Sequence, residues 1–142
     1  MNKHIAKYTI RALASLSIIA AVSLSLYVAK PWRGNNAYQN PGGYVILAGF
    51  MTWGIVPHIA LLLLSRHVST SHPPTLLRLV TAVVVCIGGT TLLFRTIYLH
   101  PDPQSGLAFI FLPIYQLGVI GLGELILLAV RMIHTLLVHT NS

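Results

Sequence analysis

Long apolar runs separated by short polar segments dominate the hydropathy pattern of this chain. Four runs approach or exceed the about 20 residues that a helix needs to cross a bilayer, and they predict helices over about 8–29, 43–65, 75–99 and 106–138. Strands of a membrane barrel would alternate with a period of two, which these runs do not. Lipid offers the backbone no hydrogen-bond partner, so each segment that crosses the membrane must satisfy its own backbone groups, as an α-helix does. The pattern predicts an all-α membrane protein, a four-transmembrane-helix bundle forming a single domain over residues 1–142.

The composition supports this prediction and excludes other classes. Hydrophobic residues make up 55% of the chain and charged residues only 8%, whereas a soluble domain carries about 25% charged residues. A disordered chain would combine low hydrophobicity with high charge. The formal net charge of +7 comes from basic residues at the ends of the apolar runs. Membrane topology explains that placement, so no nucleic-acid partner is expected.

The distribution of Lys and Arg predicts the orientation. With the N-terminus in the cytoplasm, six of the nine basic residues lie on the cytoplasmic side, which favours cytoplasmic N- and C-termini. These six are Lys3, Lys7, Arg11, Arg66, Arg78 and Arg131. The first apolar stretch, Ala12 to Ala29, has 18 residues. That is longer than the core of a secretory signal peptide, so we expect a retained helix.

Glu124 is the one acidic residue inside an apolar run, and it forms the centre of the predicted intramembrane polar cluster. A charge at membrane depth costs at least about 2.5 kcal/mol, so it requires a partner or a path for water. His58 is expected at a similar depth, and Arg78 and Arg11 each enter a helix from the same side. Two interpretations stay open: a packing lock that joins helices, or a proton or cation site.

Two prolines interrupt the second and fourth predicted helices. Pro57 precedes His58, and Pro113 precedes Tyr115 and Gln116. A proline in a helix frees a carbonyl one turn earlier and can kink the helix. We expect simple kinks here, with Tyr115 and Gln116 in hydrogen bonds between helices.

Outside the apolar runs, the sequence offers little chemistry. Asp102 lies in an outer loop and is expected to pair with Arg95 or Arg33. The seven histidines show no convincing metal-ligand spacing. No nucleophile–base arrangement, phosphate-binding glycine loop or carboxylate pair is present. We therefore expect no enzyme activity, no metal and no cofactor.

The segment PDPQSGLAFIFLPIYQL, from Pro101 to Leu117, resembles a pattern found in small, functionally uncharacterised bacterial inner-membrane proteins. It joins a loop with Asp and Gln to Gly-Leu, an aromatic-rich apolar run and Pro-x-Tyr-Gln. The resemblance implies a four-helix protein of the bacterial inner membrane and no particular activity. The resemblance also implies that five residues of this segment are characteristic of these proteins: Asp102, Gln104, Pro113, Tyr115 and Gln116.

The expected function follows from the scarcity of polar chemistry and from small residues that favour close helix packing. The leading hypothesis is a non-enzymatic accessory subunit or an interaction or immunity-type protein acting through helix–helix contacts. Its partners would be the lipid bilayer and a second copy or a larger membrane complex. One alternative is a small proton- or cation-coupled transporter or channel that uses Glu124 and His58 and acts as a dimer. Another is a membrane anchor associated with haem or quinone.

Overall fold

The structure of the protein is a computed structural model that describes residues 3–29, 41–67, 72–99 and 105–140, all of them helical. In chain order the elements are α1 (Lys3–Ala29), α2 (Pro41–Leu64), the 3-10 turn η3 (Ser65–His67), α3 (His72–Val83), the π-helical turn η4 (Val84–Gly88), α4 (Gly89–Phe94), the π-helical turn η5 (Arg95–Leu99) and α5 (Ser105–Thr140). Four helical stretches are long and apolar enough to cross a membrane. The prediction of an all-helical chain with four such stretches is confirmed.

Prolines mark where the helices begin and end. α2 begins at Pro41, and α3 carries Pro73 and Pro74 in its first turn. A proline suits this position because the N–H it lacks would have no partner inside the helix. α1 ends at Ala29, two residues before Pro31. The observed starts at residues 3, 41, 72 and 105 precede predicted starts near 8, 43, 75 and 106.

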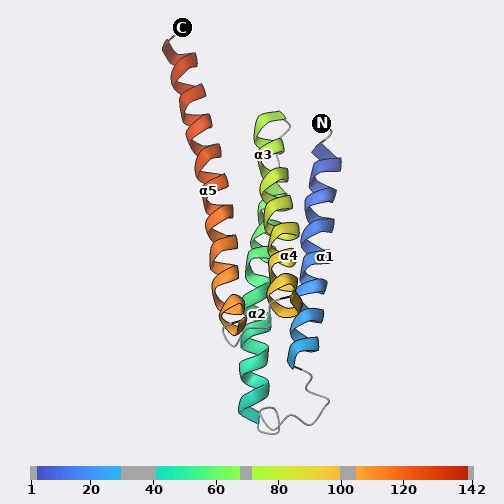
Figure 1. Ribbon diagram of the computed structural model, residues 1–142. Helices are drawn as coiled ribbons and strands as arrows, with labels where there is room; N and C mark the ends of the chain where they lie inside the picture. The colour runs from blue at the N-terminus through green and yellow to red at the C-terminus, as the bar shows by residue number, and fades with distance from the viewer. Residues whose placement is uncertain (1–2, 30–40, 68–71, 100–104, 141–142) are drawn as a thin grey trace.

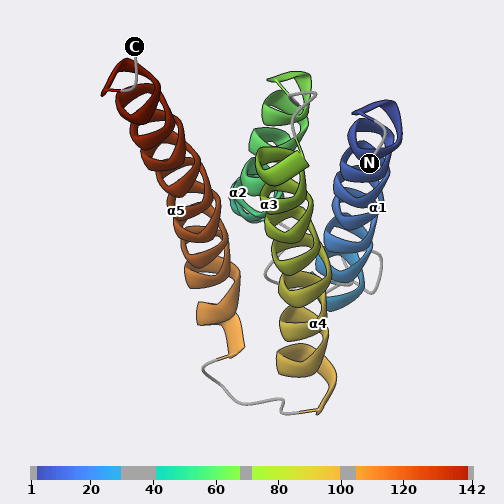
Figure 2. The ribbon, with the colours of Figure 1, turned by 90° about the horizontal axis from the view of Figure 1, so that it is seen from above.

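The four stretches lie along one another in a bundle (Figure 1). α2 and α3 each contact both α1 and α5. Seen from above, α1 and α5 lie on opposite sides of the stretch formed by α3 and α4 (Figure 2). The starts of α1 and α3 and the end of α5 lie at one end of the bundle (Figure 1). We call this the charged end, because Arg11, Arg78 and Glu124 lie towards it.

The third stretch departs from regular α-helical geometry, although it contains no proline after its first turn. Its two π-helical turns, η4 and η5, cover residues 84–88 and 95–99. Such turns widen the helix and are usually short insertions within an α-helix. Pro57 and Pro113, in contrast, lie inside α2 and α5, and both helices run through them without a break. The interruptions therefore lie in a helix where the sequence predicted none.

Small side chains let the helices approach closely. The buried core cluster draws Ala6, Ile10 and Ala14 from α1, and Ala82 from α3. It is completed by Leu61, Val85, Cys86 and Ile120. Large apolar side chains point outwards instead, with Ile19, Val45 and Leu125 more than half exposed. An apolar outer surface of this kind suits contact with lipid.

Candidate functional site

The charged end is built around a paired arginine and glutamate. Arg78 of α3 donates from Nε to Oε1 of Glu124 and from Nη2 to Oε2, each over 2.8 Å. The Arg78 side chain is 9% exposed and the Glu124 side chain 32% exposed. This two-bond geometry is the strongest that Arg and a carboxylate form. Of the three partners that the sequence offered for Glu124, the structure pairs it with Arg78.

Two further contacts extend the pair to the other helices. Arg78 also donates from Nη1 to the carbonyl of His67, at the end of η3. Arg11 of α1 donates from Nε to the hydroxyl of Ser65 over 3.2 Å, and that hydroxyl donates to the carbonyl of Leu62 over 2.6 Å. Polar contacts therefore connect all four helical stretches at the charged end. Removing one member of a buried ion pair costs about 3–5 kcal/mol, because it leaves the other charge unpaired.

His58 lies apart from this network, although the sequence placed it in the same cluster. It is 3% exposed, and neither ring nitrogen has a hydrogen-bond partner among the described residues. The ring approaches the carbonyl of Gly54, one turn earlier on α2, without satisfying hydrogen-bond geometry. Leaving a buried polar group unsatisfied costs about 1–3 kcal/mol. His58 therefore stands out as a polar group that the described protein does not satisfy.

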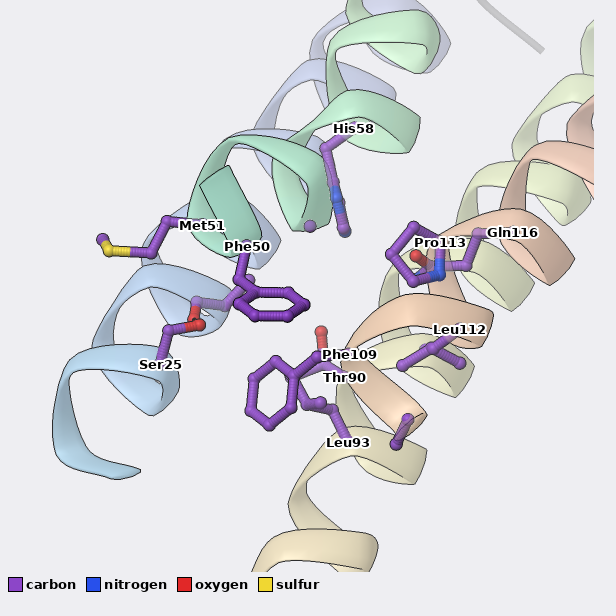
Figure 3. A pocket seen from close by; sticks show the side chains of 14 residues that line it. Ser25, Phe50, Met51, His58, Thr90, Leu93, Phe109, Leu112, Pro113 and Gln116 are labelled. Carbon is purple, nitrogen blue, oxygen red and sulfur yellow. Dashed lines mark hydrogen bonds between the residues drawn. The ribbon is translucent and has the colours of Figure 1, made fainter. Parts of the chain in front are cut away.

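The ring of His58 points into a cavity between the helices (Figure 3). We call it the polar cavity. Its volume is about 30 Å³. Polar side chains reach it from each of the four helical stretches: Ser25, His58, Thr90 and Gln116. Apolar walls come from Ala21, Phe50, Met51, Gly54, Gly89, Leu93, Ala108, Phe109, Leu112 and Pro113.

Gln116 forms a hydrogen bond between helices at the edge of the polar cavity, as the sequence predicted. Its Nε2 donates to the carbonyl of Val85, inside the π-helical turn η4, over 2.9 Å. Gly89 makes this approach possible, because a Cβ there would lie 1.8 Å from Nε2 of Gln116. Tyr115, which the sequence placed in the same role, is 70% exposed. The pair of adjacent glycines, Gly88 and Gly89, is the sequence signal that marks this close contact.

Two further contacts join α5 to its neighbours. One involves Trp53, which the sequence did not single out, and the other involves Gly123, one of the small residues expected to favour close helix packing. Trp53 of α2 donates from its indole Nε1 to the carbonyl of Ile110 on α5 over 3.0 Å. Gly123 faces α3 so closely that a Cβ would lie 2.8 Å from Oγ1 of Thr81. Gly123 precedes Glu124, so the close approach of α5 to α3 also brings Glu124 within reach of Arg78. Nothing in hydropathy alone distinguishes these positions from their neighbours.

A groove opens between α1 and the third helical stretch. Its volume is about 290 Å³, and we call it the α1–α4 groove. Its lining consists of Leu13, Leu16, Ser17, Ala20, Cys86, Ile87, Thr90 and Thr91. Five of these eight side chains are Ser, Ala, Thr or Cys and are smaller than Leu, so another backbone can approach closely. Thr91 is exposed and Ala20 and Thr90 are half-buried, while Ser17 and Cys86 are buried.

The remaining predicted site residues are Asp102 and Arg95, the expected outer-face pair. Asp102 lies outside the described residues, so its expected pairing with Arg95 stays a prediction. Arg95 itself is exposed. Within residues 3–29, 41–67, 72–99 and 105–140, no group of three His, Cys, Asp or Glu side chains is placed to hold a metal ion.

Comparison with known proteins adds no function to this geometry. No protein-family model, curated protein or solved structure matches the chain. Function is therefore inferred from the residues of the charged end, the polar cavity and the α1–α4 groove.

Proposed function

We propose that this chain is a non-enzymatic integral membrane protein that acts through helix–helix contacts. It serves as an accessory subunit of a larger membrane complex or as an interaction or immunity-type protein. In this proposal it spans the bacterial inner membrane four times with both termini in the cytoplasm, in line with the six basic residues on that side. The observation that carries the proposal is the α1–α4 groove.

The chemistry of the groove suits a transmembrane helix of a partner. Lipid gives helices no hydrophobic reason to associate, so membrane interfaces rely on close packing and on hydrogen bonds from Ser and Thr. Ala20, Thr90 and Thr91 supply small size and hydroxyl groups along the groove, and Leu13 and Leu16 supply apolar flanks. None of the eight described residues that line the groove is charged. A partner helix that presents small or branched apolar residues would therefore fit it best.

The charged end supports an interaction protein over a transporter that uses Glu124. Both carboxylate oxygens of Glu124 are bound by Arg78, which makes the pair a lock between α3 and α5. His58 lies in a separate cavity of about 30 Å³. The same volume disfavours a haem or quinone anchor, because a cavity that admits even benzene measures about 150 Å³.

Position-specific cysteine crosslinking in native membranes tests the proposal. In a Cys86→Ala background, Leu16→Cys places a thiol on the groove, and Leu125→Cys places one on α5 at nearly equal exposure, 64% and 65% for the native side chains. We expect an adduct from Leu16→Cys only, and its loss when Ala20→Phe fills the groove. The adduct mass distinguishes a second copy from another protein. Equal adducts at both positions, or none at Leu16→Cys, would refute the proposal.

A further inference from the structure

The polar cavity contains a buried group that requires a partner. An imidazole offers a donor at one nitrogen and an acceptor at the other when it is neutral. Both nitrogens of His58 are buried and unpartnered among the described residues. Its ring nevertheless points into the polar cavity rather than into the apolar packing around it (Figure 3). This orientation indicates that something in the polar cavity completes its hydrogen bonds.

Other groups around the cavity keep hydrogen-bonding capacity. The Ser25 hydroxyl donates to the carbonyl of Ala21 over 2.8 Å, and its oxygen remains an acceptor. Gln116 uses Nε2 on Val85, which leaves its side-chain carbonyl. The hydroxyl of Thr90 also lines the cavity.

Pro113 adds a backbone acceptor to the same place. Because proline has no N–H, the carbonyl of Phe109, four residues earlier, lacks its usual donor within α5. Phe109 and Pro113 both line the polar cavity. A ligand there thus meets polar groups from several helices, as a buried water needs two to four partners.

The volume of the polar cavity and the charge of its lining residues limit which ligand it can hold. The volume of about 30 Å³ exceeds the roughly 10–15 Å³ that one water requires and falls far below the about 150 Å³ that admits an aromatic ring. The fourteen lining residues include no Asp, Glu, Lys or Arg, and His58 is the one histidine among them. An ion would lose its hydration there without a counter-charge. These properties favour a small neutral molecule.

We propose that the polar cavity binds about one or two water molecules, held by His58 together with Thr90 and Gln116. The bound water satisfies the imidazole and joins α2 to α4 and α5 at a level where Pro113 has removed a helical hydrogen bond. The site lies between the helices and is distinct from the partner surface proposed above, with which its lining shares only Thr90.

Nuclear magnetic resonance of the full chain in bicelles tests this site. With ¹⁵N-labelled histidine, and His58→Gln to assign the signal, we expect a neutral imidazole whose ring proton shows magnetisation transfer from long-lived water. Thr90→Val, which keeps the side-chain shape but removes the hydroxyl, should weaken this transfer. Thr91→Val, at the exposed neighbouring position, should leave it unchanged. Absence of transfer in the native chain overturns the proposal.

Thermal unfolding in mild detergent gives a second test, because a hydrated cavity and a dry cavity predict opposite shifts in the melting temperature. If water satisfies His58, then His58→Leu removes a satisfied group and lowers the melting temperature. The expected shift is about 4 °C, as for the loss of one hydrogen-bonded group in a chain of this length. If the polar cavity is dry, His58→Leu removes an unsatisfied group and raises the melting temperature. A rise would overturn the proposal even if the resonance of His58 escaped assignment.

Discussion

The charged end and the polar cavity both bury polar groups in one bundle, but they satisfy them differently. At the charged end, Arg78 engages both oxygens of Glu124 and a backbone carbonyl. In the polar cavity, Gln116 is bonded to Val85, while both ring nitrogens of His58 lack a partner in the part of the chain that the structure describes. A polar network that is complete within the chain joins helices, whereas an incomplete one leaves a place for a ligand.

The difference has a geometric origin. The Arg78 side chain is long, so its guanidinium reaches three acceptors on two other elements. The imidazole of His58 is short and rigid, and most backbone groups around it are already bonded within their helices. A comparison of the two regions therefore separates residues that hold the bundle together from those that shape a binding space.

The largest effect is expected from breaking the charged pair. Glu124→Leu leaves Arg78 buried and unpaired, and we expect the free energy of unfolding to fall by about 3 kcal/mol, the lower end of the range because Glu124 is partly exposed. Unfolding in mixed micelles with increasing dodecyl sulfate measures the change. The double variant Arg78→Leu, Glu124→Leu should recover most of the loss. If it is as unstable as the sum of the single variants, the pair is not coupled.

The second largest loss of stability is expected at Gly89, the glycine beside the polar cavity. Gly89→Ala forces a Cβ into the amide of Gln116, and overpacking of this kind costs about 1–3 kcal/mol. Gly88→Ala is the matched control, because nothing lies within 4 Å of a Cβ there. The same unfolding assay should separate the two neighbours, and Gln116→Ala should relieve the loss in Gly89→Ala. Equal behaviour of the two glycine variants would contradict the close contact.

A smaller effect is expected where α5 approaches α3. Gly123→Ala brings a Cβ against Thr81, and a hydroxyl can rotate away, so the loss should be about 1 kcal/mol. Gly121→Ala, which meets nothing within 4 Å, should stay near the native stability. Thr81→Ala in the Gly123→Ala background should restore the lost stability. A full loss of the Arg78–Glu124 coupling in Gly123→Ala would indicate that α5 has moved as a whole.

The smallest effect concerns the hydrogen bond from α2 to α5. Trp53→Phe removes the indole donor to the carbonyl of Ile110, and hydrogen bonds between membrane helices average about 0.6 kcal/mol. Tyr115→Phe on α5, whose native side chain is 70% exposed, serves as the control and should change nothing measurable. A loss several times larger would mean that Trp53 acts mainly through packing.

Hydropathy identified the four helical stretches, because crossing a bilayer sets their length and lipid enforces their backbone pairing. It also singled out Glu124 and Gln116, since polar residues at membrane depth require partners. It did not choose among Arg78, Arg11 and His58 as the partner of Glu124. Residue depth was the only guide, and depth says nothing about which faces of two helices meet.

The sequence by itself determined the helical class, the number of apolar stretches and which few residues carry charge, because these depend on local composition. Only the tertiary structure decided that Glu124 meets Arg78, that Arg11 meets Ser65, and that His58 faces a cavity. It also placed two π-helical turns in the third stretch, one of them next to Gly89, while α2 and α5 run through Pro57 and Pro113. Such pairings depend on the rotation of each helix about its axis, which the packing of small side chains from several helices fixes together.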